Sequence, residues 1–93
     1  MAGIGEELKL ARQAKAVIEA KPRKETLAVL RKANILAAAQ MTTFSSAGPL
    51  NDARHKLGLA LPPIMQAQPS QDKIDNAKAA IEAWINELEA AKP

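Results

Sequence analysis

The chain contains a single histidine, His55, which follows Asp52 by three residues. Residues three apart share one face of a helix, so this carboxylate could orient a ring nitrogen of the imidazole or join it in a metal site. A stable zinc site needs three or four ligands, however, and the sequence has no other histidine and no cysteine. We therefore expect an Asp–His pair on the protein surface, with no bound metal and no other cofactor.

The remaining side chains that could perform catalysis have simpler structural explanations. Ser and Thr residues fall at predicted helix ends and loops, where hydroxyl groups cap backbone atoms. The carboxylates of Glu6 and Glu7, and those of Glu87 and Glu89, are expected on exposed helix faces, outside the apolar surroundings that favour general acid catalysis. The four glycines form no phosphate-binding motif. The sequence predicts that the chain is not an enzyme.

Basic residues in the first half of the chain form the clearest candidate binding site. Residues 1–46 contain eight Lys or Arg and four Glu, whereas residues 47–93 contain five Lys or Arg and six acidic residues. Positive charge at the start of a helix opposes the helix dipole, so a purely stabilising role does not explain this cluster. The cluster could contact phosphate, nucleic acid or an acidic protein, or it could form a solvated basic face. Its members are Lys9, Arg12, Lys15, Lys21, Arg23, Lys24, Arg31 and Lys32.

The elements that must position these residues are predicted to be helices. Of the 93 residues, 20 are Ala, the strongest helix former, while the aromatic residues are limited to Phe44 and Trp84. A chain of this length supports one hydrophobic core, and the absence of cysteine excludes a disulfide scaffold. The sequence therefore predicts an all-α, single-domain bundle over residues 1–93.

Hydrophobic periodicity divides this bundle into three main helices and one short helix. The first two are expected at about residues 5–20 and 23–43. The second is apolar on more than one face, which predicts a central position with the first and last helices packed across it. The short helix is expected at about 49–61, and the last main helix at about 71–91 with Ser70 as its N-cap. Residues 62–69 are expected to form an extended connector, because Pro62 and Pro63 interrupt a regular helix.

The second predicted helix also offers surface for contact between chains. It includes much of Ala33 to Asn51, the longest run without charge. A lone Asn within an apolar helix surface can fix an oligomeric state, or it can lie at the edge of the apolar stripe and bond to water or backbone. Both readings remain open for Asn34. The candidate self-association residues are Asn34, Ala37 and Met41.

These features favour a non-catalytic interaction protein that binds a macromolecular partner or its own copies. Accessory subunits, inhibitors and components of larger assemblies, including viral ones, share this profile. The alternative is a nucleic-acid-binding accessory protein whose basic face contacts phosphates without reading bases. The N-terminal residues do not resemble a signal peptide, and Ala33 to Asn51 is too polar to span a membrane, so the sequence predicts a cytoplasmic protein.

Overall fold

The computed structural model describes residues 3–19, 24–43, 48–66 and 68–91, and these contain four α-helices. Helix α1 spans Ile4–Glu19, α2 spans Lys24–Thr43, α3 spans Pro49–Ile64 and α4 spans Gln71–Ala91. The all-helical prediction is confirmed. The division into three main helices and one short helix is not, because α3 has 16 residues, the same number as α1.

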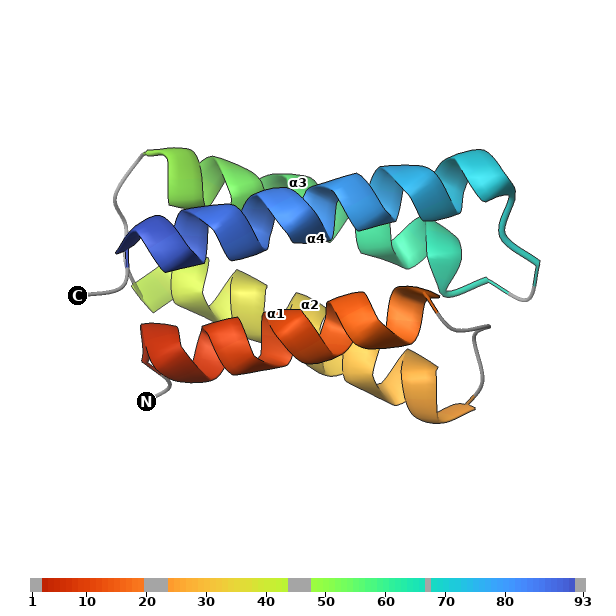
Figure 1. Ribbon diagram of the computed structural model, residues 1–93, viewed down its shortest axis with the longest axis horizontal. Coiled ribbons are helices and arrows are strands. Elements are labelled where there is room, and N and C mark those ends of the chain that lie inside the picture. The colour runs from red at the N-terminus through yellow and green to blue at the C-terminus, as the bar shows by residue number, and fades with distance from the viewer. Residues whose placement is uncertain (1–2, 20–23, 44–47, 67, 92–93) are drawn as a thin grey trace.

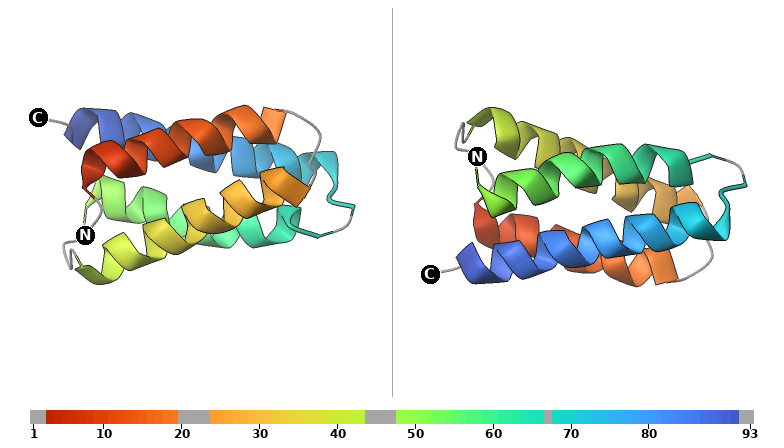
Figure 2. Two further views of the ribbon diagram at one scale, coloured as in Figure 1. Left: turned by 90° about the horizontal axis from the view of Figure 1, so that it is seen from below. Right: turned by 90° about the horizontal axis from the view of Figure 1, so that it is seen from above.

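Successive helices run in opposite directions and form a four-helix bundle (Figure 1). Helices α1 and α2 form one layer and α3 and α4 form the other, and the two further views in Figure 2 show the same arrangement. Each helix contacts two neighbours, in the order α1, α2, α3, α4 and back to α1. The start of α1 and the end of α4 therefore lie at the same end of the bundle.

The expected central position of the second helix is wrong. Within the described residues, α2 packs against α1 and α3 but not against α4, which lies diagonally across the bundle. The reason is that much of the additional apolar surface on α2 is alanine, and Ala28 and Ala38 are exposed rather than covered by another helix. Alanine has too little apolar area to require burial.

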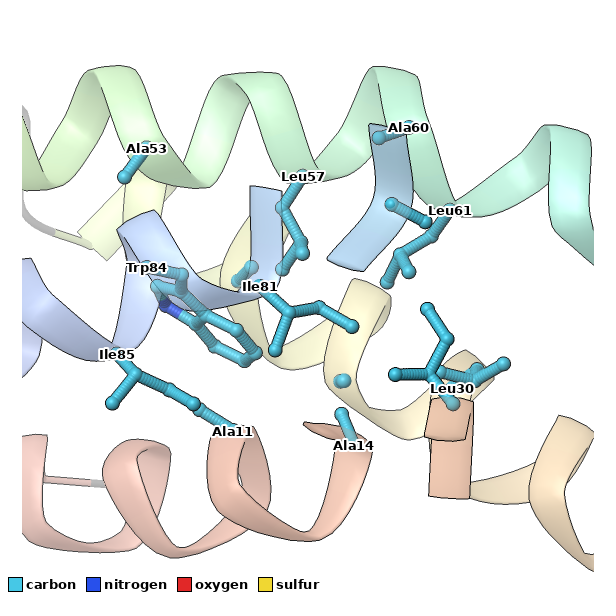
Figure 3. Packing of buried hydrophobic residues seen from close by; sticks show 14 of the residues in the cluster. Ala11, Ala14, Leu30, Ala53, Leu57, Ala60, Leu61, Ile81, Trp84 and Ile85 are labelled. Carbon is cyan, nitrogen blue, oxygen red and sulfur yellow. The ribbon is translucent and has the colours of Figure 1, made fainter. Parts of the chain in front are cut away.

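The core lies along the axis between the four helices, and every helix contributes to it. Figure 3 shows Trp84 and Ile81 from α4 pointing into the interior above Ala14 of α1. Ile81, Trp84 and Leu88 are fully buried, so α4 turns one face into the core at spacings of three and four residues. Buried alanines on facing helices let the backbones approach closely around these larger side chains. They are Ala11, Ala14, Ala33, Ala37, Ala53, Ala60 and Ala77.

The end of α3 departs from the prediction, because the helix continues through Pro62 and Pro63 to Ile64. Proline has no N–H, so these two residues leave the carbonyls one turn earlier without a helical donor. Those carbonyls belong to Gly58 and Leu59, which are exposed residues and can be solvated. Burial of Ile64, which is 2% exposed, favours the additional turn.

The start of α4 agrees with the prediction. The backbone N–H of Lys73 donates to Ser70 Oγ at 3.4 Å, so Ser70 is the N-cap. Among the described residues, no helix combines the length and the continuous hydrophobicity that a membrane crossing requires.

Candidate functional site

Two large apolar side chains extend into solvent from neighbouring helices. Ile35 on α2 is 68% exposed and Leu59 on α3 is 66% exposed. The Oδ1 atom of Asn34 lies 3.8 Å from the position that a Cβ atom would take on Gly58, so these two residues face each other across the helix pair. Ile35 and Leu59, each the next residue along its helix, therefore lie at the same level of the bundle.

A groove of about 220 Å³ runs between α2 and α3, and Leu59 is one of its lining residues. One wall contains Gly58, whose missing side chain leaves the space open. We call this surface the α2–α3 face, which comprises Ile35 and the residues that line the groove. The lining residues are Asn34, Ala38, Met41, Arg54, His55, Gly58 and Leu59.

The α2–α3 face carries little exposed charge. No carboxylate is found among the described residues that line the groove. Arg54 borders the groove, but its side chain is only 4% exposed and its charge is paired inside the protein. Arg31 is exposed one helical turn before Ile35, and His55 is exposed on the opposite wall. The surface is therefore mainly apolar, with a weak positive character.

Arg54 is held by Glu7, a glutamate of α1 that is completely buried. The guanidinium Nε–H donates to Glu7 Oε2 at 2.8 Å, and Nη2 donates to Glu7 Oε1 at 2.6 Å. This two-point geometry is the strongest form of an Arg–carboxylate pair. The pair therefore holds Arg54, a lining residue of the groove, against α1, the helix diagonal to α3.

Two further donors complete the surroundings of the Glu7 carboxylate. The indole Nε1–H of Trp84 donates to Oε2 at 2.7 Å, and Gln40 Nε2 donates to Oε1 at 3.3 Å. Glu7, Gln40, Arg54 and Trp84, which we call the buried polar cluster, supply one side chain from each of the four helices. A buried ion pair is tolerated only when such hydrogen bonds satisfy its remaining atoms. Its four side chains are at most 4% exposed, and Arg54 also lines the groove between α2 and α3.

The expectation that Glu7 lies on an exposed helix face is therefore wrong. A signal was present in the spacing, because Glu7 precedes Ala11, Ala14 and Ile18 by four, seven and eleven residues and shares their buried face. Arg54 likewise precedes Leu57 and Leu61 at helical spacing. Charged side chains usually lie at the protein surface, but a buried partner of opposite charge on another helix can outweigh this preference.

These features can be set against known proteins. No known protein family, curated protein or solved structure matches this chain. Its function is therefore inferred from its own surfaces.

The basic residues predicted as a contact site are spread over two helices. Lys9, Arg12 and Lys15 are exposed on α1, and Arg31 and Lys32 are exposed on α2. Arg12 Nη2 lies 4.0 Å from Glu89 Oε1 of α4, so its charge has an acidic neighbour. A groove of about 400 Å³ follows the outer side of α1. Its lining residues are Gly5, Leu8, Lys9, Arg12, Gln13 and Ala16. Lys21, Arg23 and the side chain of Lys24 lie outside the described part of the structure.

The predicted self-association residues have different surroundings. Asn34 and Met41 are partly buried and line the groove of the α2–α3 face. Ala37 is 1% exposed and belongs to the core. Only the first two could touch a partner without a change in the fold.

Asp52 and His55 are both exposed on α3. The described residues contain no group of three or more His, Cys, Asp or Glu side chains that could hold a metal ion. His55 lines the groove between α2 and α3 and therefore belongs to the α2–α3 face.

Proposed function

We propose that this chain is a non-catalytic interaction protein whose α2–α3 face binds a macromolecular partner. The observation that carries this proposal is the exposure of two large apolar side chains on neighbouring helices, Ile35 on α2 and Leu59 on α3, with a mainly apolar groove lined by Leu59 between these helices. They are the large hydrophobic side chains that stand clearly exposed within the described residues. Single exposed apolar residues are common, but exposed apolar side chains on neighbouring helices, one of them lining a groove with little charge, favour a binding surface.

The rigid support beneath this face favours the same function. Arg54 forms part of the groove wall and is fixed by the buried polar cluster. Binding to a preformed surface avoids the entropic cost of ordering it.

Affinity capture from an extract of the source cells tests the proposal. The immobilised wild-type chain is compared with Ile35→Ser and Leu59→Ser, and bound proteins are quantified by mass spectrometry. Each substitution should reduce capture of a specific partner at least tenfold, because both residues are exposed apolar anchors. Ala90→Ser on α4, an exposed position outside the linings of both grooves, is the control and should leave capture unchanged. Equal capture by all four proteins contradicts the proposal.

A second candidate function, phosphate contact by the basic residues, has one observation in its favour. Lys9 and Arg12 line the groove on α1, where they lie one helical turn apart. Contacts to phosphate release counterions, so binding of duplex or single-stranded oligonucleotides should weaken steeply as salt rises. Lys9→Glu with Lys15→Glu should abolish such binding. Salt-independent binding, or binding that these substitutions do not change, contradicts this second function.

A further inference from the structure

We propose that the groove of the α2–α3 face binds a carboxylate of a partner protein, an Asp or Glu side chain that accepts hydrogen bonds from the Arg54 guanidinium. This inference rests on the proposed function and specifies the chemistry that the partner presents. It follows from the N–H groups of Arg54 that Glu7 does not use, from the charge around the groove and from the apolar side chains that line it.

Arg54 keeps one hydrogen-bonding edge that Glu7 does not occupy. A guanidinium carries five N–H groups in one plane, on Nε, Nη1 and Nη2. Glu7 accepts the Nε–H and one N–H of Nη2. None of the described residues accepts a hydrogen bond from Nη1. The edge formed by Nη1 and the second N–H of Nη2 thus lacks a partner in this part of the chain, and such an edge matches the two oxygens of a carboxylate.

The groove between α2 and α3 gives access to this edge. Arg54 lines that groove although its side chain is only 4% exposed. No atom of Arg54 is among the buried side-chain atoms that lack a hydrogen-bond partner in the described ranges, so solvent reaches Nη1. The groove on α1 and a further groove between α3 and α4 are lined by other residues. Arg54 is therefore a recessed donor for a ligand in the α2–α3 groove.

The charge around the groove favours an anion, and specifically one with a single negative charge. His55 is exposed on the α3 wall, and Arg31 is exposed one helical turn before Asn34 on α2. Basic groups without a nearby carboxylate on the groove complement an acidic partner. Glu7 lies behind the guanidinium, with Oε1 2.6 Å from Nη2 of Arg54. Its charge would repel a doubly charged phosphate more strongly than a carboxylate.

The apolar lining of the groove indicates which kind of carboxylate fits. Ala38, Met41 and Leu59 lie along the groove beside the polar groups. A site of this kind obtains affinity from its apolar walls, while a few placed donors fix the orientation of the ligand. The volume of about 220 Å³ suits side chains of a peptide segment. The docking segment of the partner should therefore join an Asp or Glu to a large apolar residue.

Selection from a displayed library of short random peptides tests the inference. The immobilised wild-type chain should enrich peptides in which Asp or Glu stands beside Leu, Ile, Met or Phe. The peptide that binds best is synthesised, and its affinity is measured by fluorescence anisotropy. Replacement of its acidic residue by the matching amide should weaken binding roughly tenfold or more, because hydrogen bonds to a charged group are lost. Enrichment of peptides without an acidic residue, or of none at all, overturns the inference.

Gly58→Leu fills the groove without a change in Arg54 or Glu7. A Cβ atom at this position would meet only Asn34 Oδ1, at 3.8 Å, so the bundle should still fold. The variant should bind the selected peptide roughly tenfold more weakly or worse. Ala90→Leu, at an exposed position of α4, is the matched control and should bind like the wild type. Circular dichroism confirms that both variants are folded. Wild-type affinity in Gly58→Leu overturns the inference.

Contact with the guanidinium itself is read from the Nε–H resonance of Arg54 in ¹⁵N NMR spectra. The selected peptide should shift this resonance, whereas that of Arg12, whose guanidinium is exposed beside Glu89, should not move. Acetate should compete only weakly, since it lacks the apolar part. An Arg54 resonance that stays in place while the peptide binds overturns the inference, and so does inorganic phosphate that displaces the peptide better than acetate.

The failure of this inference can be separated from failure of the proposed function. A chain that captures a partner through Leu59, but selects peptides that need no acidic residue, retains the binding function of the face and overturns the carboxylate site. A chain whose capture is independent of Ile35 and Leu59, and whose peptides bind equally well to Gly58→Leu, overturns both.

Discussion

At the scale of single residues, the protein depends most on Glu7. Its carboxylate is fully buried and accepts hydrogen bonds from Arg54, Trp84 and Gln40. The desolvation of two charges largely offsets their attraction, so the pair contributes little net stability compared with apolar residues of the same shape. Removal of one partner alone should lower the stability strongly, because it leaves the other charge buried and unpaired.

Arg54→Met should therefore destabilise the protein by about 3–5 kcal/mol. The physical reason is the uncompensated Glu7 carboxylate in the core. Urea denaturation followed by Trp84 fluorescence measures the loss. Glu7→Leu combined with Arg54→Met should recover only part of it, because the unpaired charge is gone but the buried indole N–H of Trp84 has lost its acceptor. Arg12→Met is the control, since its pair with Glu89 is exposed and should contribute only about 0.2–1 kcal/mol. Equal effects of the two arginine substitutions would show that the buried pair has no special role.

At the scale of elements, each helix combines strong local preferences with one or two unfavourable residues. Gly58 is an exposed residue within α3, where glycine costs conformational entropy. A Cβ atom at this position would meet only Asn34 Oδ1, at the ordinary contact distance of 3.8 Å. The fold of the monomer therefore does not require a glycine at this position. The missing side chain of Gly58 instead affects the shape of the groove that it lines.

Gly58→Ala should raise the stability of the fold by about 0.5–1 kcal/mol. For a domain of this size, that gain corresponds to an increase in Tm of several degrees. Thermal denaturation followed by circular dichroism measures it. A fall in Tm at a concentration where the chain is monomeric contradicts the prediction.

Ser70→Ala should cost about 1 kcal/mol, because it removes the side-chain acceptor for the backbone N–H of Lys73 at the start of α4. Ser70→Asp keeps an acceptor at the N-cap and should retain the wild-type stability. Denaturation midpoints of the three proteins in urea compare these effects. Identical midpoints for the Ala and Asp variants would mean that the cap contributes nothing.

At the scale of the whole molecule, the buried polar cluster joins all four helices at one point. Glu7, Gln40, Arg54 and Trp84 each come from a different helix, so no helix can leave the bundle without breaking a bond to the cluster. This arrangement favours one register of the helices, as a buried polar residue does in helical assemblies.

The bundle should therefore unfold in a single cooperative transition. The loss of helix, measured by far-UV circular dichroism, should coincide with the change in Trp84 fluorescence, which reports on the cluster. The comparison is made at several protein concentrations, because dimerisation would shift both curves together. A fluorescence transition that precedes the loss of helix would mean that the cluster opens before the bundle does.

The sequence by itself determined the helical class, the bounds of α4 and the Ser70 cap. These features depend on neighbours within about a turn, and helical periodicity and capping are local properties. The C-terminal end of α3 was not predictable from local sequence rules. Pro62 and Pro63 favour termination of the helix, but burial of Ile64 outweighs this preference.

Only the tertiary structure decided which polar residues are buried and which apolar residues are exposed. Glu7 and Arg54 are 47 residues apart, and each is acceptable in the core only because the other is there. In the same way, Ile35 and Leu59 form one surface because α2 and α3 are neighbours and Asn34 faces Gly58. Pairing between distant helices depends on packing of the complete bundle, and no local pattern in the chain contains that information.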